Sequence, residues 1–143
     1  MSIQPQHVKT KVFEIGDFGQ PKIKIGGDEP FVLIAGPCQI ESLDHALMMA
    51  EKIAEACAPT GTKFIYKSSY DKANRSSIGT ARGIGMAEGL DILAAVRDKF
   101  GCPVLTDVHD THQCEPVGKQ VDVIQIPAFL CRQTDRVLAA GAT

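Results

Sequence analysis

The stretch "FVLIAGPCQIESLDHALMMAEKIAEACAPTG", residues 31–61, contains a strand pattern followed by a helix pattern. Residues 31–36 form a continuous apolar run, which is typical of a strand covered on both faces. Ser42 is suited to cap a helix, and Pro59 and Gly61 are suited to end it. The apolar residues between them fall on one helical stripe, made of Leu43, Ala46, Leu47, Ala50, Ile53, Ala54 and Cys57. Residues 31–61 therefore predict one strand–helix unit.

The same alternation continues toward the C-terminus. Three further strands are predicted, at "KFIYKSS" (63–69), "PVLTDVH" (103–109) and "VDVIQIPA" (121–128). Helices are predicted at "GMAEGLDILAAVRDKFG" (85–101), with Leu90, Leu93, Ala94 and Phe100 facing inward, weakly at about 112–119, and from within "RQTDRVLAAGA" (132–142). Strands that alternate with helices predict a parallel sheet with right-handed crossovers.

Four such units fit an open α/β sheet or half of a (β/α)8 barrel. The segment "GTARGIG" (79–85) lacks the G-x-G-x-x-G spacing, which weighs against a dinucleotide-binding fold. A complete barrel takes roughly 250 residues, so a chain of 143 residues corresponds to about its first four units. Before them, "KVFEIGD" (11–17) and "PKIKIGG" (21–27) predict a half-buried hairpin. The predicted organisation is a hairpin cap at 1–30 and the N-terminal half of a barrel at 31–143.

Composition excludes several classes of protein. The net charge of −2 gives no field that would recruit nucleic acid or an acidic membrane. No apolar run approaches the roughly 20 residues of a membrane span, and the polar N-terminus does not resemble a signal peptide. The five cysteines show no pairing pattern and no C-x-x-C, which favours reduced thiols in the cytoplasm.

Polar side chains follow each predicted strand, in "GPCQIES" (36–42), "KSSYDKANRSS" (67–77), "DVHDTH" (107–112) and "QIPAFLCRQ" (125–133). Because the carboxyl ends of parallel strands share one edge of a sheet, the sequence predicts one site built from four loops. In the second loop the cationic donors are Lys67, Lys72 and Arg75. A solvated basic loop is one interpretation, but an unpaired lysine at the end of a buried strand is costly. An anionic, phosphorylated ligand is therefore favoured.

Two other residue groups leave alternatives open. Cys38 fits a buried thiol, a nucleophile that uses His109 as its base, or a metal ligand. Asp107 and His109 alternate along a strand and so share a face, which fits either a structural hydrogen-bond network or a site. A metal pair of His109 and His112 has poor spacing. The residues by themselves do not decide between these alternatives for Cys38, Asp107 and His109.

Several ordered motifs together resemble the 3-deoxy-D-manno-octulosonate 8-phosphate synthase family. They are "AGPCQIES" (35–42), "KSSYDKANRSS" (67–77), "RGIGMAEGLDIL" (82–93), "TDVHD" (106–110) and "VIQIPAFLCRQTD" (123–135). The related 3-deoxy-arabino-heptulosonate 7-phosphate synthases share "GPC" but carry a KPRTS-like stretch where this chain has "KANRSS" (72–77). This difference favours the octulosonate family.

The resemblance implies a (β/α)8 barrel that condenses phosphoenolpyruvate with arabinose 5-phosphate, for lipopolysaccharide synthesis in the cytoplasm of Gram-negative bacteria. It implies a homotetramer and no nucleic-acid or membrane partner. By position it assigns Asn74, Arg75 and Ser76 to the binding of arabinose 5-phosphate, with Arg75 binding the phosphate. It places Lys67 and Lys72 near the reacting carbons, Asp107 on sugar hydroxyls, Gln125 and the Ala128 backbone on phosphoenolpyruvate, and His109 in the same mouth.

Cysteine in the "GPC" position (36–38) is the mark of the metal-dependent members of that family, so the resemblance makes Cys38 a ligand of a divalent metal. A His, a Glu and an Asp from the second half of the barrel would complete the metal set, and these lie outside the 143 residues. We therefore expect this polypeptide alone to bind divalent metal and turn over poorly or not at all. A heptulosonate synthase and a non-catalytic phospho-sugar binding module remain the alternatives.

Overall fold

A computed structural model describes residues 10–72 and 82–143. The predicted sugar-phosphate grip of Asn74, Arg75 and Ser76 lies outside the described residues. The strands are β1 (Phe13–Ile15), β2 (Ile23–Ile25), β3 (Val32–Ala35), β4 (Lys63–Lys67), β5 (Val104–Asp107) and β6 (Val123–Gln125). The helices are α1 (Leu43–Cys57), α2 (Met86–Phe100), α3 (Thr111–Gly118) and α4 (Thr134–Gly141), with short 3-10 turns η1 (Ala58–Thr60) and η2 (Ala128–Leu130).

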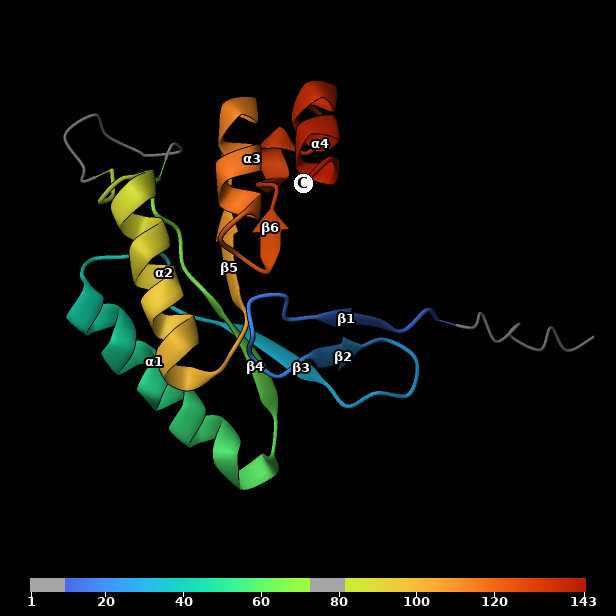
Figure 1. Ribbon diagram of the computed structural model, residues 1–143, viewed down its shortest axis with the longest axis vertical. Helices are drawn as coiled ribbons and strands as arrows, with labels where there is room; N and C mark the ends of the chain where they lie inside the picture. The colour runs from blue at the N-terminus through green and yellow to red at the C-terminus, as the bar shows by residue number, and fades with distance from the viewer. Residues whose placement is uncertain (1–9, 73–81) are drawn as a thin grey trace, which may run out of the picture.

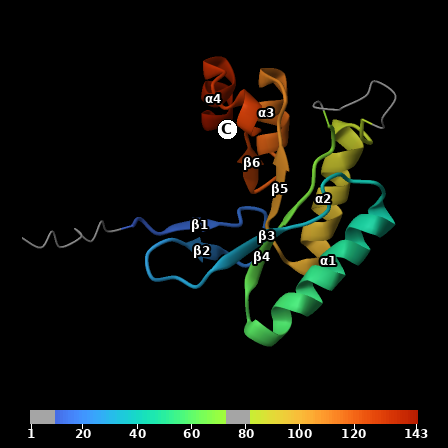
Figure 2. The same cartoon turned by 180° about the vertical axis from the view of Figure 1, so that it is seen from behind.

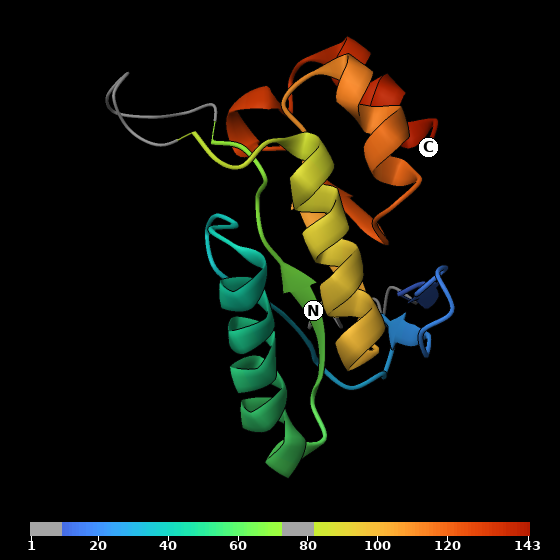
Figure 3. The same cartoon turned by 60° about the vertical axis from the view of Figure 1, so that its left-hand side comes forward.

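The larger sheet is parallel and has the order β3-β4-β5-β6, so each strand pairs with the next one along the chain. The register sets Ile34 beside Ile65 and Asp107 beside Gln125. The helices connect the strands, and α1 lies beside α2 while α3 lies beside α4 (Figures 1 and 3). The predicted α/β architecture with a parallel sheet is confirmed, and it is consistent with part of a (β/α)8 barrel.

Local sequence explains where the helices begin and end. The Ser42 hydroxyl accepts a hydrogen bond from the His45 backbone N–H at 3.2 Å, as predicted for a helix cap. At the start of α3, Asp110 and Gln113 form a reciprocal capping box, so this helix is better defined than the weak pattern predicted. The helix α2 ends at Gly101, which has a φ of 62°.

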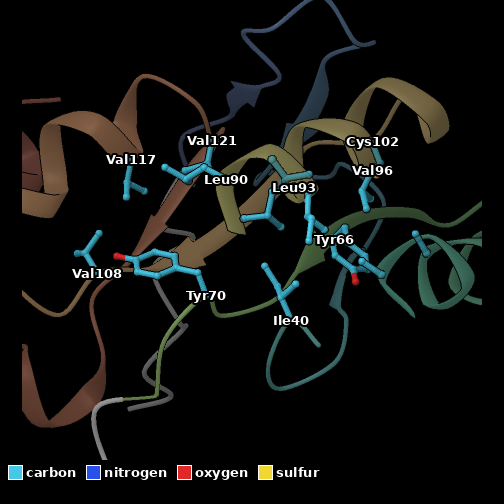
Figure 4. Packing of buried hydrophobic residues seen from close by; sticks show 14 of the residues in the cluster. Ile40, Tyr66, Tyr70, Leu90, Leu93, Val96, Cys102, Val108, Val117 and Val121 are labelled. Carbon is cyan, nitrogen blue, oxygen red and sulfur yellow. The ribbon is translucent and has the colours of Figure 1, made fainter. Parts of the chain in front are cut away.

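The core lies between the sheet and the helices (Figure 4). Leu90 and Leu93 of α2 are buried against Tyr66 of β4, as the helical stripe predicted. The prediction for α1 is wrong at Leu43, which is 43% exposed because it occupies the first turn of the helix. The predicted burial of the first parallel strand on both faces is also wrong, because Ile34 is 52% exposed.

The smaller sheet is the antiparallel pair β1–β2, which confirms the predicted hairpin. It lies on the other side of β3 and β4 from α1 (Figures 1 and 2). Ile23 is buried but Phe13 is 53% exposed, so the expected half-burial is wrong for the start of β1. The division into a cap at 1–30 and a half-barrel at 31–143 stays a prediction.

Asp122 attaches the hairpin to the amino ends of β5 and β6. Its Oδ1 accepts hydrogen bonds from the Asp17 backbone N–H at 3.1 Å and from the Gln20 side-chain amide. Its Oδ2 accepts the Val104 backbone N–H at 2.8 Å. The guanidinium of Arg97 in α2 also lies 4.3 Å from the centre of the Phe18 ring. These contacts make the hairpin a cover for the amino end of the sheet.

Within the two described ranges, no helix is long and apolar enough to cross a membrane.

Candidate functional site

Three of the predicted site residues share one face at the carboxyl end of the sheet. Lys67 pairs in register with Leu105, and Asp107, two residues further on, pairs with Gln125. Because side chains alternate along a strand, Lys67, Asp107 and Gln125 all lie on the face opposite the core residues Tyr66 and Val104. The structure thus brings side chains from three strands to one surface.

The segment after β3 packs closely against the end of β4. Three residues, Gly36 to Cys38, separate Ala35 from Gln39, whereas two separate their partners Tyr66 and Ser69, so β3 continues into a bulge. A Cβ atom at Gly36 would lie 1.8 Å from the Lys67 carbonyl oxygen, so only glycine fits. Cys38 is exposed, and the alternative of a buried thiol is therefore wrong.

Lys72 bends back toward β4. Its Nζ donates to the Ser69 hydroxyl at 2.8 Å, and Ser69 itself is fully buried. Ser69 is two residues beyond Lys67 on the same strand line, which the Gln39–Ser69 pairing prolongs. Lys67 is partly buried. The Lys72 side chain therefore returns to the strand line that carries Lys67.

Asp71 and Arg82 form a two-point ion pair that the sequence reasoning missed. The Arg82 Nε lies 2.8 Å from Asp71 Oδ1, and the Arg82 Nη2 lies 3.0 Å from Oδ2. The Lys72 backbone N–H also donates to the Arg82 carbonyl at 2.7 Å. Hydrogen bonding from Arg82 holds the pKa of the Asp71 carboxyl below its usual value. The available signal was that Asp71 is the only acid in residues 66–83.

Asp107, which is buried, forms a pair with His109, which is largely covered. Asp107 Oδ2 lies 3.0 Å from His109 Nε2, and the two side chains are 8% and 10% exposed. The other atoms of the pair, Asp107 Oδ1 and His109 Nδ1, are buried without a hydrogen-bond partner among the described residues. An unpartnered buried polar atom is costly. A purely structural network would satisfy these atoms, so the pair favours a site that binds a ligand.

Tyr70 and Gln113 are further residues that the sequence reasoning missed. The Tyr70 hydroxyl donates to Gln113 Oε1 at 3.0 Å, and the Tyr70 ring meets the His109 ring edge-on with centroids 6.0 Å apart. Burial, with help from Asp107 and Asp71, raises the pKa of Tyr70 above its usual value. Figure 4 shows the Tyr70 hydroxyl directed toward Val108. Gln113 carried a capping-box signal three residues after Asp110, but Tyr70 carried none.

The fourth loop contributes mainly through its backbone. The Gln125 carbonyl accepts the Val108 N–H at 3.1 Å, and its side chain is partly buried. Ala128 is the first residue of η2, where backbone N–H groups have no partner within the turn. Arg132 is exposed.

The metal-ligating types do not gather in the described part of the chain. No group of three His, Cys, Asp or Glu residues able to hold a metal ion is present within residues 10–72 and 82–143. His112 is exposed, and its Nδ1 lies 3.5 Å from Asp110 Oδ1. The described residues therefore do not form a complete metal centre by themselves.

Comparison with known proteins identifies the family of this chain. The model of the DAHP synthetase I family matches residues 3–143. The chain belongs to the DAHP synthetase I family.

Three relatives with similar sequences carry the same name. A 2-dehydro-3-deoxyphosphooctonate aldolase from Granulibacter bethesdensis is 52% identical over 143 residues, which are 100% of this chain and 49% of that protein. Proteins of the same name from Rickettsia bellii and Rickettsia prowazekii are 60% and 59% identical over 121 residues, covering 85% of this chain and 44% of each of them. The chain therefore spans about half the length of the curated relatives it matches.

Proposed function

We propose that this chain provides the phosphate- and hydroxyl-binding part of a 3-deoxy-D-manno-octulosonate 8-phosphate synthase. The observation that carries the proposal is the shared face of Lys67, Asp107 and Gln125 at the carboxyl ends of adjacent parallel strands. The names of the relatives support it, because 2-dehydro-3-deoxyphosphooctonate aldolase is another name for this activity. The proposed setting is a cytoplasmic homotetramer with a complete (β/α)8 barrel, serving lipopolysaccharide synthesis.

The proposed reaction joins phosphoenolpyruvate to arabinose 5-phosphate. The enol carbon forms a bond to the aldehyde carbon, and the aldehyde oxygen takes a proton to become a hydroxyl. Water adds to the phosphate-bearing carbon. This intermediate then loses inorganic phosphate by C–O cleavage and leaves the eight-carbon keto acid phosphate.

This reaction brings two negatively charged substrates together, and they repel each other. In the proposal, Lys67 and Lys72 bind phosphoenolpyruvate and lower the repulsion between the substrates. The bond from Lys72 to Ser69 supports a fixed position for one of these amines. Gln125 and the backbone N–H of Ala128, the first residue of η2, add donors for the same substrate.

The sugar is assigned to the other half of the site. Asp107 Oδ1 and His109 Nδ1 need partners, and hydroxyl groups of arabinose 5-phosphate would supply them. Asn74, Arg75 and Ser76 would hold the phosphate of that sugar, with a bidentate guanidinium contact from Arg75.

Metal dependence is proposed on the "GPC" position alone. Cys38, being exposed at the end of β3, would supply one thiolate ligand. A bound divalent metal would orient the aldehyde or activate water. Since the described residues do not complete a metal centre, no step of the reaction is assigned to the metal.

A fusion protein tests the proposed activity. Residues 1–143 would be joined to the remaining length of the Granulibacter bethesdensis relative and assayed for phosphate release with phosphoenolpyruvate, arabinose 5-phosphate and divalent metal. We expect turnover that Lys67→Ala lowers at least about 100-fold, the scale of an electrostatic group at the reacting centre. Unchanged turnover in Lys67→Ala would contradict the assignment of this lysine.

The name of the DAHP synthetase I family favours a second candidate, a heptulosonate synthase. The same fusion should prefer arabinose 5-phosphate over erythrose 4-phosphate as the acceptor, and the reverse preference would select the second candidate. The 143-residue chain, titrated separately with each substrate, tests the alternative of a binding module. Such a module would bind arabinose 5-phosphate and ignore phosphoenolpyruvate.

A further inference from the structure

Gln113 accepts more hydrogen bonds than its place in the helix requires. Its Oε1 lies 3.1 Å from the Asp110 backbone nitrogen, which is the ordinary capping-box bond of α3. The same oxygen lies 2.7 Å from the His109 backbone nitrogen and 3.0 Å from the Tyr70 hydroxyl. One side-chain oxygen therefore joins the start of α3, the end of β5 and the end of β4.

Tyr70 is held in place on the β4 side of this junction. The residue is 1% exposed. A Cβ atom at Gly89 would lie 2.4 Å from the Tyr70 Cβ, and one at Gly83 would lie 2.3 Å from the Tyr70 carbonyl oxygen. Because only glycine admits the tyrosine this closely, its hydroxyl reaches Gln113 from a fixed backbone.

On the β5 side, Gln113 holds the backbone of His109. An ionised Asp107 can only accept hydrogen bonds, so the 3.0 Å contact requires His109 Nε2 to carry the proton. In the neutral ring, His109 Nδ1 is then a lone-pair acceptor, and it is buried without a partner in the described ranges, as is Asp107 Oδ1. The bond from the His109 N–H to Gln113 sets the main chain from which this ring extends.

We propose that Gln113 is a positioning residue which, together with Tyr70, holds His109 as its Nε2–H tautomer against Asp107. The acceptors His109 Nδ1 and Asp107 Oδ1 then stay available for a hydroxyl-bearing ligand. The assignment of that ligand as the acceptor sugar phosphate rests on the proposed function. The tautomer of His109 does not depend on it.

The groups around His109 set the conditions for the test. Asp107 comes from β5, Tyr70 and Asp71 from the end of β4, and Asp110 from the start of α3. All four are acidic, and a substitution at Gln113 keeps all four residues while it alters the hydrogen bonds from the Tyr70 hydroxyl and the Asp110 backbone N–H. Gln113→Met removes the acceptor oxygen without adding a charge, whereas Gln113→Glu keeps an acceptor and adds one negative charge beside these groups.

The first measurement is the pair of ring ¹⁵N shifts of His109 in the 143-residue chain near neutral pH. Gln113→Met keeps the length of the side chain and removes the acceptor, whereas Gln113→Glu keeps an acceptor suited to this helix position. We expect the Nε2–H signature in the parent chain and in Gln113→Glu, and a mixture of tautomers in Gln113→Met. A folded Gln113→Met with parental ring shifts would overturn the proposal.

Tyr70→Phe keeps the proposal testable if Gln113→Met does not fold. It removes one of the three bonds to Gln113 and leaves the ring packing intact, so we expect a smaller shift in the same direction. Parental ring shifts in a folded Tyr70→Phe would show that the tyrosine takes no part in positioning His109.

The second measurement is the kinetics of the fusion protein. Residues that orient metal ligands by hydrogen bonds contribute about 10- to 100-fold, and we expect Gln113→Met to lower kcat/KM by about the same factor. The change should appear mainly in the KM for arabinose 5-phosphate, with little change for phosphoenolpyruvate, and Gln113→Glu should restore it. If the ring signature responds but the parent fusion is inactive, the positioning role stands and the proposed function fails.

Discussion

Asp122 and Asp107 lie at opposite ends of the β5–β6 pair and have opposite hydrogen-bonding situations. Asp122, at the amino end, accepts bonds on both oxygens, from Asp17, Gln20 and Val104. Asp107, at the carboxyl end, bonds only to His109 and keeps one buried oxygen without a partner in the described residues. The comparison teaches that the polar groups at one end of this sheet are satisfied within the chain, and that at the other end they are left without partners among the described residues.

The largest effect we expect comes from the backbone of the carboxyl end. Gly36→Ala places a Cβ 1.8 Å from the Lys67 carbonyl oxygen, so β3 and β4 must separate. The free energy of unfolding, measured by urea denaturation, should fall by about 3 kcal/mol or more. This result would sharpen the comparison. It would show that the backbone at the carboxyl end is tightly packed and that only its polar side chains lack partners among the described residues.

Gly141→Ala is the matched control, because no atom lies within 4 Å of the added Cβ. Its free energy of unfolding should stay within about 0.5 kcal/mol of the parent value. Equal losses in both variants would mean that the effect does not come from the contact with Lys67.

The second effect tests the two aspartates directly. Asp122→Ala leaves the buried Val104 N–H without an acceptor and should lower the free energy of unfolding by about 2–3 kcal/mol. Asp107→Asn removes a buried carboxylate that is only half satisfied, so its cost should stay below about 1 kcal/mol. Chemical denaturation of both variants at one pH is the measurement. A cost for Asp107→Asn as large as that for Asp122→Ala would break the comparison.

A smaller effect concerns the attachment of the hairpin to α2. Phe18→Leu removes the ring that lies 4.3 Å from the Arg97 guanidinium, and should lower the free energy of unfolding by about 1 kcal/mol. Phe129→Leu alters a ring that is 87% exposed, and should change it little. Similar losses from the two substitutions, measured by denaturation, would argue against a stabilising contact at the amino end.

The smallest effect is a pH dependence of the free energy of unfolding, caused by the ion pair of Asp71 and Arg82. Because the Asp71 pKa is lowered in the folded state, the pair stabilises the fold above the ordinary value of 3.8. This contribution is lost as the pH falls through the lowered pKa. The difference in unfolding free energy between the parent and Asp71→Asn should therefore be constant from pH 7 to 5 and shrink below about pH 4.

Asp91→Asn, at an exposed position of α2, serves as the control for this profile. A parent and an Asp71→Asn variant with parallel acid profiles would show that Arg82 does not influence the titration of Asp71. The ion pair would then make no pH-dependent contribution to the stability of the carboxyl end.

The sequence by itself determined the order and kind of the elements. Apolar periodicity and capping residues are local signals, so the strand–helix alternation and the start of α1 at Ser42 followed from neighbouring residues alone. The motifs around Cys38, Lys67 and Asp107 likewise indicated the family through the identity and spacing of their residues alone.

Only the tertiary structure decided which groups meet and which faces are covered. Tyr70 reaches Gln113 across 43 positions, and Asp122 reaches Asp17 across 105, and no local pattern specifies such partners. The exposure of Ile34 and Cys38 also depended on what packs against β3, because an apolar run or a lone thiol looks the same whether it is covered or open. Periodicity reports a preference of neighbours along the chain, whereas a site is made by residues that folding brings together from distant segments.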